Sequence, residues 1–263
     1  MANPEHLALV QQGAAVWNPW RLRHAEVVPN LVAADLSHLD LAHINLAGAH
    51  LDRADLSQTR LRYADLSHAN GAETLCLGAD FTGANLGQAD FSRSNLIGAE
   101  LQRANLRSAL FDRADLSRAD LTGTIAIAVN LESANLTFTN FYQAELGHAH
   151  LANACLRQAR LISAHLRNTF LFRADLSAAL LLGADLGWAH LVQAHLVQAD
   201  LRGANLRGAN LGRSNLSHAN LTRANLRGAD LSQAHLQNAT LLNANLNEAI
   251  LSHTRLQEAI LEG

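Results

Sequence analysis

Aliphatic side chains recur at every fifth residue along most of this 263-residue chain. From Leu31 to Leu261, 47 positions stand five residues apart, and Leu or Phe occupies 44 of them. The exceptions are Gly71, Cys76 and Ala126. Two residues before these sites, from position 34 to 259, Ala fills 35 of 46 positions and Ser or Thr fills eight more. Asp or Asn most often lies between the two, and no insertion or deletion shifts the register.

This five-residue period fits neither a regular helix nor a regular strand. On an α-helix, five residues turn the side chain by roughly 140°, so the Leu residues would spread around the helix. On a strand, an odd step places alternate Leu residues on opposite faces. The chain must therefore bend once per repeat, so that each pentapeptide forms one short side of a coil. The Leu and the Ala two residues before it then point inward, and the other three positions face solvent.

Repeats such as 54–58 (Ala-Asp-Leu-Ser-Gln) and 204–208 (Ala-Asn-Leu-Arg-Gly) resemble those of the pentapeptide-repeat family. The resemblance covers residues 31–263 and implies an all-β fold, a right-handed quadrilateral β-helix with four pentapeptides per coil. The array would then form about 11 to 12 stacked coils. We expect a repeat domain over 31–263, preceded by a capping helix and linker over 1–30.

The N-terminal segment has the pattern of a short amphipathic helix over residues 4–17. Asn3 is a suitable N-cap and Pro4 suits the first helical position, while Pro19 is expected to end the helix. Its apolar face consists of Leu7, Val10, Ala14 and Trp17. We expect this face to cover the first coil, where the large Leu39 and Ile44 replace the usual Ala.

The other end of the array shows no comparable helix. Ile250 and Ile260 lie at outward positions of the last coils, and Leu261 lies at an inward one. These residues suggest a homodimer formed through the C-terminal coil, as the resemblance also implies for some family members.

Residues 124–129 (Thr-Ile-Ala-Ile-Ala-Val) fit the repeat least well. A one-residue slip would bring Ile125 and Ile127 inside and leave a bulge. Without a slip, both residues form an exposed apolar spot. The sequence leaves both alternatives open.

Two rows of outward residues are candidate partner-binding surfaces. The first is apolar and consists of Tyr142, Ile162 and Leu182 on successive coils, with Leu180 beside them. The second consists of Arg53, Arg93, Arg113, Arg173 and Arg213 at one outward position. It is suited to an acidic partner, although Glu73 interrupts it. Either row can also be ordinary exposed surface.

Metal, cofactor and catalytic sites are not expected. His150 and His190 share a face two coils apart, near 10 Å by the strand spacing, too far for one zinc. Cys76 points inward and Cys155 outward, so a disulfide between them is not expected. The sequence shows no nucleophile arrangement or phosphate loop, and flat walls offer no pocket for catalysis. We therefore expect a protein that is not an enzyme.

The charge distribution helps to compare the functional hypotheses. The net charge is −3, with 12 acids and 8 Arg over 31–129 but 4 acids and 9 Arg over 150–230. The first hypothesis is a binding or scaffolding module with an unknown protein partner. The resemblance implies a second, a DNA mimic that binds DNA gyrase and confers resistance to topoisomerase poisons. Mimicry is favoured only by the early acids: Asp35, Asp40, Asp52, Asp55, Asp65, Asp80 and Asp90. Direct nucleic-acid binding and membrane association are not expected. The N-terminus shows no signal peptide, which suggests a cytoplasmic protein.

Overall fold

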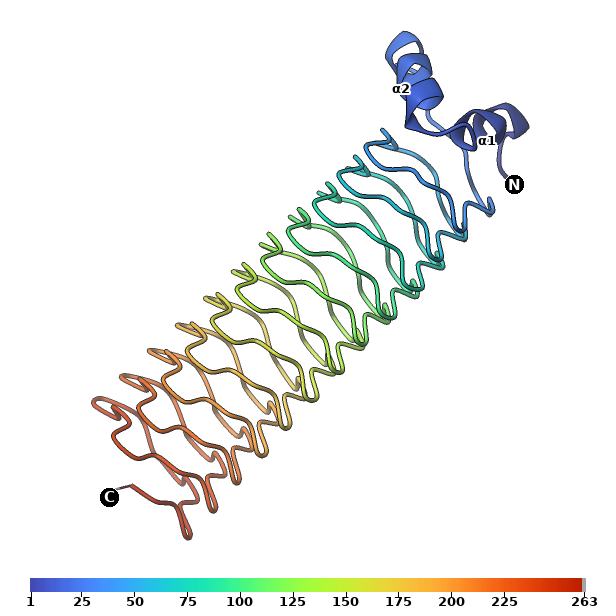
Figure 1. Ribbon diagram of the computed structural model, residues 1–263. Helices are drawn as coiled ribbons and strands as arrows, with labels where there is room; N and C mark the ends of the chain where they lie inside the picture. The colour runs from blue at the N-terminus through green and yellow to red at the C-terminus, as the bar shows by residue number, and fades with distance from the viewer. Residues whose placement is uncertain (262–263) are drawn as a thin grey trace.

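The computed structural model describes residues 1–261 as a straight rod of stacked coils with helices at one end (Figure 1). The helices are α1 (Pro4–Val10) and α2 (Ala14–Arg23). All β-structure consists of single parallel bridges, from Asn30↔His50 to Thr240↔Ile260. Each bridge joins a residue to the one twenty positions later, so four pentapeptides make one coil. The predicted right-handed quadrilateral β-helix is confirmed. None of the described helices has the length and apolarity needed to cross a membrane.

The four sides of the coil are named here by their bridged residues. Wall A contains the column that begins with Asn30 and His50, and wall B the column that begins with Asp35. Wall C begins with Asp40 and wall D with Asn45. Walls A and C are opposite each other, as are walls B and D. The two residues after each inward Leu form the corner that leads to the next wall.

Every corner is a turn of the same kind. At nearly every inward position the carbonyl accepts a bond from the N–H three residues later, as Leu206 does from Ala209 at 3.0 Å; Leu36 is the exception. The second corner residue has a positive φ of 53–67° in all 46 repeats, and in 37 of them it is not Gly. A positive φ at the second corner residue but not at the first defines a type II turn. Val, Ile and Thr, which tolerate this conformation poorly, never occupy the second corner position but occur ten times at the first.

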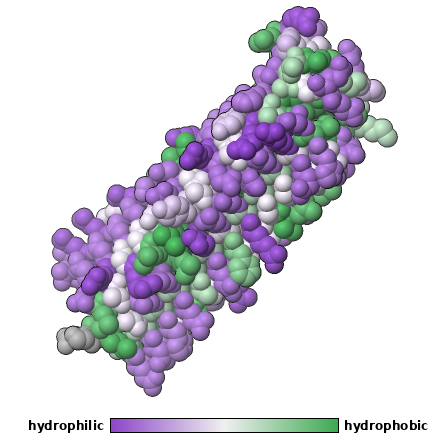
Figure 2. Space-filling view, in the orientation of Figure 1, coloured by the Kyte–Doolittle hydropathy of each residue, from purple (hydrophilic) through white to green (hydrophobic). Residues whose placement is uncertain are grey.

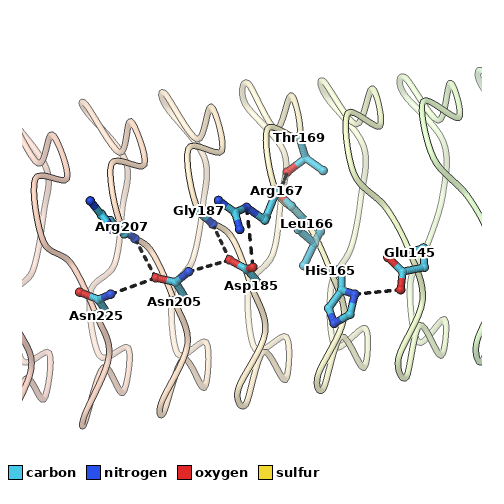
Figure 3. A network of polar contacts seen from close by, with 10 residues as sticks. All are labelled: Glu145, His165, Leu166, Arg167, Thr169, Asp185, Gly187, Asn205, Arg207 and Asn225. Carbon is cyan, nitrogen blue, oxygen red and sulfur yellow. Dashed lines mark hydrogen bonds and ion pairs between the residues drawn. The ribbon is translucent and has the colours of Figure 1, made fainter.

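The hydrogen bonds of each repeat explain the Asp or Asn of the motif. In repeat 204–208, Ala204 N–H donates within the turn, and Asn205 N–H donates to the preceding coil. The N–H groups of Leu206 and Gly208 donate to the following coil. The fifth, that of Arg207, has no backbone acceptor and donates instead to Asn205 Oδ1 at 3.3 Å (Figure 3). The Asp or Asn side chain thus satisfies the one N–H group that the coil leaves unpaired.

The same side chains also bond to one another between coils. On wall D, Asn205 Nδ2 donates to Asp185 Oδ1 at 2.8 Å, and Asn225 Nδ2 donates to Asn205 Oδ1 at 3.1 Å (Figure 3). Asp185 and Asn205 on this wall therefore both cap their own turns and join neighbouring coils.

The rod interior consists of columns of Leu and Ala side chains, nearly all of them buried. The twenty-residue spacing of the sequence predicts that Phe91 lies one coil above Gly71 and compensates for its missing side chain. This is confirmed: a Cβ at Gly71 would lie 3.0 Å from the Phe91 ring, which fills the space. Phe91 stacks on Phe111 with 5.9 Å between ring centroids. Hydroxyls that replace Ala bond inside the rod, as Thr59 Oγ1 does to the Leu36 carbonyl at 2.7 Å.

The possible slip at residues 124–129 does not occur. Ile125 is bridged to Asn105 and Glu145 in the ordinary register, and Ala126 is buried. Ile125 and Ile127 are half-exposed. A slip would break the bonds of Ile125 N–H to the coil before and of Ala126 N–H to the coil after, at 3.0 and 2.8 Å. The loss of these bonds would offset the gain from burying the two side chains.

The N-terminal segment forms two helices, so the prediction of one helix over 4–17 was wrong. Asn3 is the N-cap as predicted and accepts from Glu5 N–H at 2.9 Å. Gly13, with φ +82°, separates the helices, and Pro19 lies inside α2 rather than at its end. The contacts of α2 with the first coil keep it helical despite the missing N–H of Pro19.

These helices cover the first coil as predicted. Val10 and Trp17 are fully buried against it, together with Ile44. Side chains replace the missing preceding coil: Trp17 Nε1 donates to the Asn45 carbonyl at 2.6 Å, and Asn18 Oδ1 accepts from Asn45 N–H at 2.9 Å. His6 Nδ1 accepts from Asn30 N–H at 3.0 Å. The cap therefore blocks the open end with hydrogen bonds as well as with apolar surface.

The corner conformation makes a specific prediction about stability. Ser133 is a second corner residue with φ +58°, so Ser133→Val should destabilise the rod by about 1–2 kcal/mol. Ser117, a first corner residue, is the matched control, and Ser117→Val should change stability little. The midpoints of urea denaturation, followed by circular dichroism, measure both. Equal midpoints for the two variants would contradict the role of the positive φ.

Candidate functional site

The predicted apolar row is present on one corner of the rod. Tyr142, Ile162 and Leu182 are first corner residues between walls C and D, and Leu180 lies beside them on wall C. Tyr142, Leu180 and Leu182 are 37%, 38% and 39% exposed. Hydrophobic side chains also gather over the later coils on the face shown in Figure 2. This group of four residues is called the aliphatic corner below.

A shallow depression of about 590 Å³ continues the aliphatic corner toward the last coils. Leu182 and Leu242 line it, and Gly203 leaves room between the side chains of its neighbours. Arg202 and Arg223 border it. Arg202 donates to both oxygens of Asp200, and these hydrogen bonds hold the pKa of that carboxyl below its ordinary value.

The predicted arginine row lies at the corner between walls A and B, where each member is a second corner residue. Glu73 partly neutralises its early part, with Arg53 Nε 3.0 Å and Arg93 Nη1 3.9 Å from its carboxylate. Arg173 and Arg213 donate to Gln side chains of the following coil, at 2.8 and 3.1 Å. The row therefore consists of an internally paired early part and a later part without carboxylate partners.

The capping Asp and Asn residues are largely replaced in one band of coils. From position 145 to 195, nine of the eleven bridged positions carry another residue, against six of 23 from 30 to 140. The nine are Glu145, His150, Cys155, Arg160, His165, Phe170, Leu180, His190 and His195. Figure 3 shows the change on wall D, where the Asn and Asp ladder ends at Asp185 and His165 bonds instead to Glu145 at 2.9 Å. Ile162, Leu180 and Leu182 of the aliphatic corner lie within this band, whereas Tyr142 lies just before it, where Asn140 still caps its N–H group at 3.2 Å.

The sequence shows Phe170, Phe172 and Trp188 on other sides of the rod at the height of the Tyr142 row, and the structure places them together as a second apolar group in the same band. Phe170 lies on wall A, Phe172 at one of its corners and Trp188 at the other. They are 38%, 39% and 52% exposed. The signal was present in the sequence, because the twenty-residue period places all three around one wall.

The histidines do not form a metal site in the described part of the chain. Residues 1–261 contain no group of three or more His, Cys, Asp or Glu side chains arranged to hold an ion. His150 and His190 are kept apart by the ring of Phe170, which stacks between them.

The residues proposed for dimer formation are all exposed. Ile250 on wall A and Ile260 on wall C are 51% and 50% exposed, and the inward Leu261 is 46% exposed. Ile250 and Ile260 thus face opposite sides of the rod. A homodimer through these coils stays a prediction.

Comparison with known proteins identifies the family. The family model for pentapeptide repeats matches eight segments that together span residues 30–67 and 76–263. The chain belongs to the pentapeptide-repeat family. This pentapeptide-repeat protein matches no curated protein sequence.

Three solved structures illustrate the similarity. HetL, a pentapeptide-repeat protein of Nostoc sp. strain PCC 7120, is 33% identical over 91% of this chain and 95% of its own, with a TM-score of 0.51. Rfr23 of Cyanothece 51142 is 38% identical over 38% of this chain and 63% of its own, with a TM-score of 0.27. QnrB1, a plasmid-mediated fluoroquinolone resistance protein, is 19% identical over 89% of each chain, with a TM-score of 0.35. This pentapeptide-repeat protein therefore resembles HetL over nearly its whole length.

The two free cysteines should differ in reactivity. Cys76 is fully buried, and desolvation raises the pKa of its thiol to about 12, so little thiolate forms. Cys155 is half-buried on wall B. Ellman's reagent at mildly alkaline pH should modify Cys155 alone in the folded protein and both thiols in denaturant. Rapid modification of Cys76 in the native state would contradict its place in the core.

Proposed function

We propose that this chain is a non-enzymatic binding module whose aliphatic corner binds a protein partner. The observation that carries the proposal is the row of Tyr142, Ile162 and Leu182 on three successive coils, with Tyr142 and Leu182 exposed and Ile162 half-buried between them. Coils lie ~4.8 Å apart, so the three side chains form a continuous apolar strip along the rod. Such a strip with polar surroundings is typical of a protein-binding surface.

The loss of capping residues in this band supports the proposal. Each Asp or Asn cap contributes about 0.5–1.5 kcal/mol, as an ordinary intramolecular hydrogen bond does. Residues such as Leu180 give up that bond and remain 38% exposed, so they do not regain it by burial. Residues that depart from the repeat pattern of a fold without adding stability are expected at functional sites.

The surface also favours binding over catalysis. The described walls are regular, and the depression beside Leu182 is shallow. Catalysis needs groups that converge in a water-excluding pocket, whereas binding a partner needs only complementary surface. HetL is described as involved in the regulation of heterocyst differentiation, and regulation through a bound partner is the kind of role proposed here. We take the rod to act in the cytoplasm, the compartment expected from the sequence.

Paired substitutions test the aliphatic corner. The double variant Tyr142→Asp/Leu182→Asp should lose a partner that co-purifies with the tagged wild-type protein, because it places two charges in the apolar strip. Its matched control is Leu77→Asp/Ile97→Asp, at first corner positions between walls B and C, where Leu77 is 45% exposed. The partner should be identified by mass spectrometry, and its affinity for each purified variant measured by calorimetry. Equal affinity for the two double variants would contradict the proposal.

The alternative, DNA mimicry toward gyrase, has a weaker structural basis. Six of the seven early acids cap turns through Oδ1, as Asp65 does for Ser67 N–H at 3.0 Å; Asp52 alone does not. The turn thus accounts for most of these acids without any need to imitate phosphates. Arg60 and Arg62 also lie among them, at 3.1 and 3.6 Å from Asp40 and Asp80.

A gyrase supercoiling assay separates the two functions. We expect purified protein in large molar excess neither to inhibit supercoiling nor to protect gyrase from a topoisomerase poison. The control is a bovine serum albumin titration under the same salt conditions. Inhibition that depends on protein concentration, and that is lost when Asp52 and Asp90 are replaced by Asn, would instead support mimicry.

A further inference from the structure

We infer that wall A, over residues 147–213, is a second binding surface and that it takes an acidic segment of a partner protein. It lies opposite the wall that carries Leu180 and does not depend on the aliphatic corner. The inference rests on a stack of rings, on the charge of the wall and on the orientation of its aromatic side chains.

The centre of the wall is a stack of three rings. His150, Phe170 and His190 occupy successive bridged positions, where the repeat ordinarily has Asp or Asn. Their ring centroids are 4.9 and 5.1 Å apart, with interplanar angles of 22° and 3°. Because the rings stack along the rod axis, their faces cover one another and their edges point outward. The outer surface is therefore a row of aromatic C–H edges and imidazole nitrogens.

Aromatic side chains extend this row on both sides. At one corner, Phe172 carries the Arg173 guanidinium 4.9 Å from its ring centroid. At the other corner, the Trp188 ring lies against Gly208, where a Cβ would be 2.5 Å from it. Gly208 thus lets the indole lie flat on the next coil, where it remains 52% exposed. These side chains offer anchor points for apolar groups of a ligand.

The charge of the wall determines the kind of ligand. Over residues 147–213, wall A and its two corners contain no Asp or Glu but contain four arginines, Arg167, Arg173, Arg207 and Arg213. Arg167 is 3.9 Å from Asp185 of wall D, whereas Arg173 and Arg213 are bonded only to neutral Gln side chains. His148, His150 and His190 add groups that can donate hydrogen bonds. The surface therefore complements carboxylates, which Arg and imidazole N–H groups bind well and which favour the positive edges of aromatic rings.

The same geometry favours an acidic protein segment over single-stranded nucleic acid. Nucleobases bind by stacking on open aromatic faces. Both faces of Phe170 are covered by imidazoles, Arg173 covers one face of Phe172, and Gly208 covers one face of Trp188. Carboxylates approach from the side and need only the edges and the guanidinium groups. A segment that combines acidic residues with a few apolar ones fits both the arginines and the aromatic side chains of wall A.

A gain-of-stability variant provides the sharpest test. The triple variant His150→Asn/Phe170→Asn/His190→Asn removes the ring stack and restores the usual caps for the N–H groups two residues later. We expect its urea denaturation midpoint to be equal to or higher than that of the wild type. The probe is a short fluorescein-labelled peptide rich in Glu with a few Leu residues, and fluorescence anisotropy measures its binding. The triple variant should bind the probe about ten-fold or more weakly.

Matched controls make the result specific. Leu110→Asn lies in the same column of wall A, outside the proposed surface, and should restore a cap without changing the affinity for the peptide. Arg173→Gln/Arg213→Gln should weaken binding, and a peptide with Gln in place of Glu should bind poorly to the wild type. Tyr142→Asp/Leu182→Asp should bind the acidic peptide as the wild type does, so failure of one surface is distinguishable from failure of the other.

Several outcomes would overturn the inference. One is unchanged affinity in the triple variant. Another is equal affinity for the Glu and Gln peptides. The third is a failure of the acidic peptide to bind at millimolar concentration. Tighter binding of an oligo(dT) strand than of the acidic peptide would also reject it, in favour of nucleic acid.

Discussion

The structure depends on one constraint, the satisfaction of backbone hydrogen bonds in a chain that turns every five residues. Four of the five N–H groups in each repeat find carbonyls within the turn or in adjacent coils. The remaining one lies at the corner, where no carbonyl can reach it. The Asp or Asn two residues earlier supplies the missing acceptor, as Asp185 does for Gly187 N–H at 3.1 Å. The Ala-(Asp/Asn)-Leu motif therefore meets a hydrogen-bond requirement of the coil as well as a requirement for apolar side chains in its interior.

Most of the fold could be predicted because the main stabilising interaction, burial of apolar side chains, repeats every five residues along the sequence. Inward Leu and Ala set the coil, and the compensation between Gly71 and Phe91 followed from the twenty-residue spacing. The N-terminal cap could be predicted only in part. Local signals suggested that Pro19 ends a helix, but contacts of Trp17 and Asn18 with the first coil keep the chain helical beyond it. Such contacts join residues that no local pattern relates.

The candidate surfaces were harder to predict for a similar reason. The row of Tyr142, Ile162 and Leu182 could be found because its members share one position in the coil. The aromatic residues of wall A lie at three different positions of the coil. The sequence shows each of them, but that they surround one wall was recognised only from the positions of the corners. The structure was also needed to show that Asp and Asn cap the turns. Only then is it clear that Phe170 and its neighbours replace residues that have a structural role.

A solenoid allows such replacement because its stability is close to a sum of terms between neighbouring coils. In a globular core, the loss of several hydrogen bonds at one place would weaken the whole molecule. In this rod, the band from Glu145 to His195 contacts only the coils next to it, and its inward Leu and Ala columns continue with a single replacement, the buried Thr169. The regular coils on either side hold that band in place, with Asn at bridged positions 130, 135 and 140 before it and Asp or Asn at every bridged position from 200 to 230 after it. Stability and surface chemistry can therefore be assigned to different coils of the same rod. Five exposed aromatic and aliphatic residues lie in the band where capping has been given up: Phe170, Phe172, Leu180, Leu182 and Trp188.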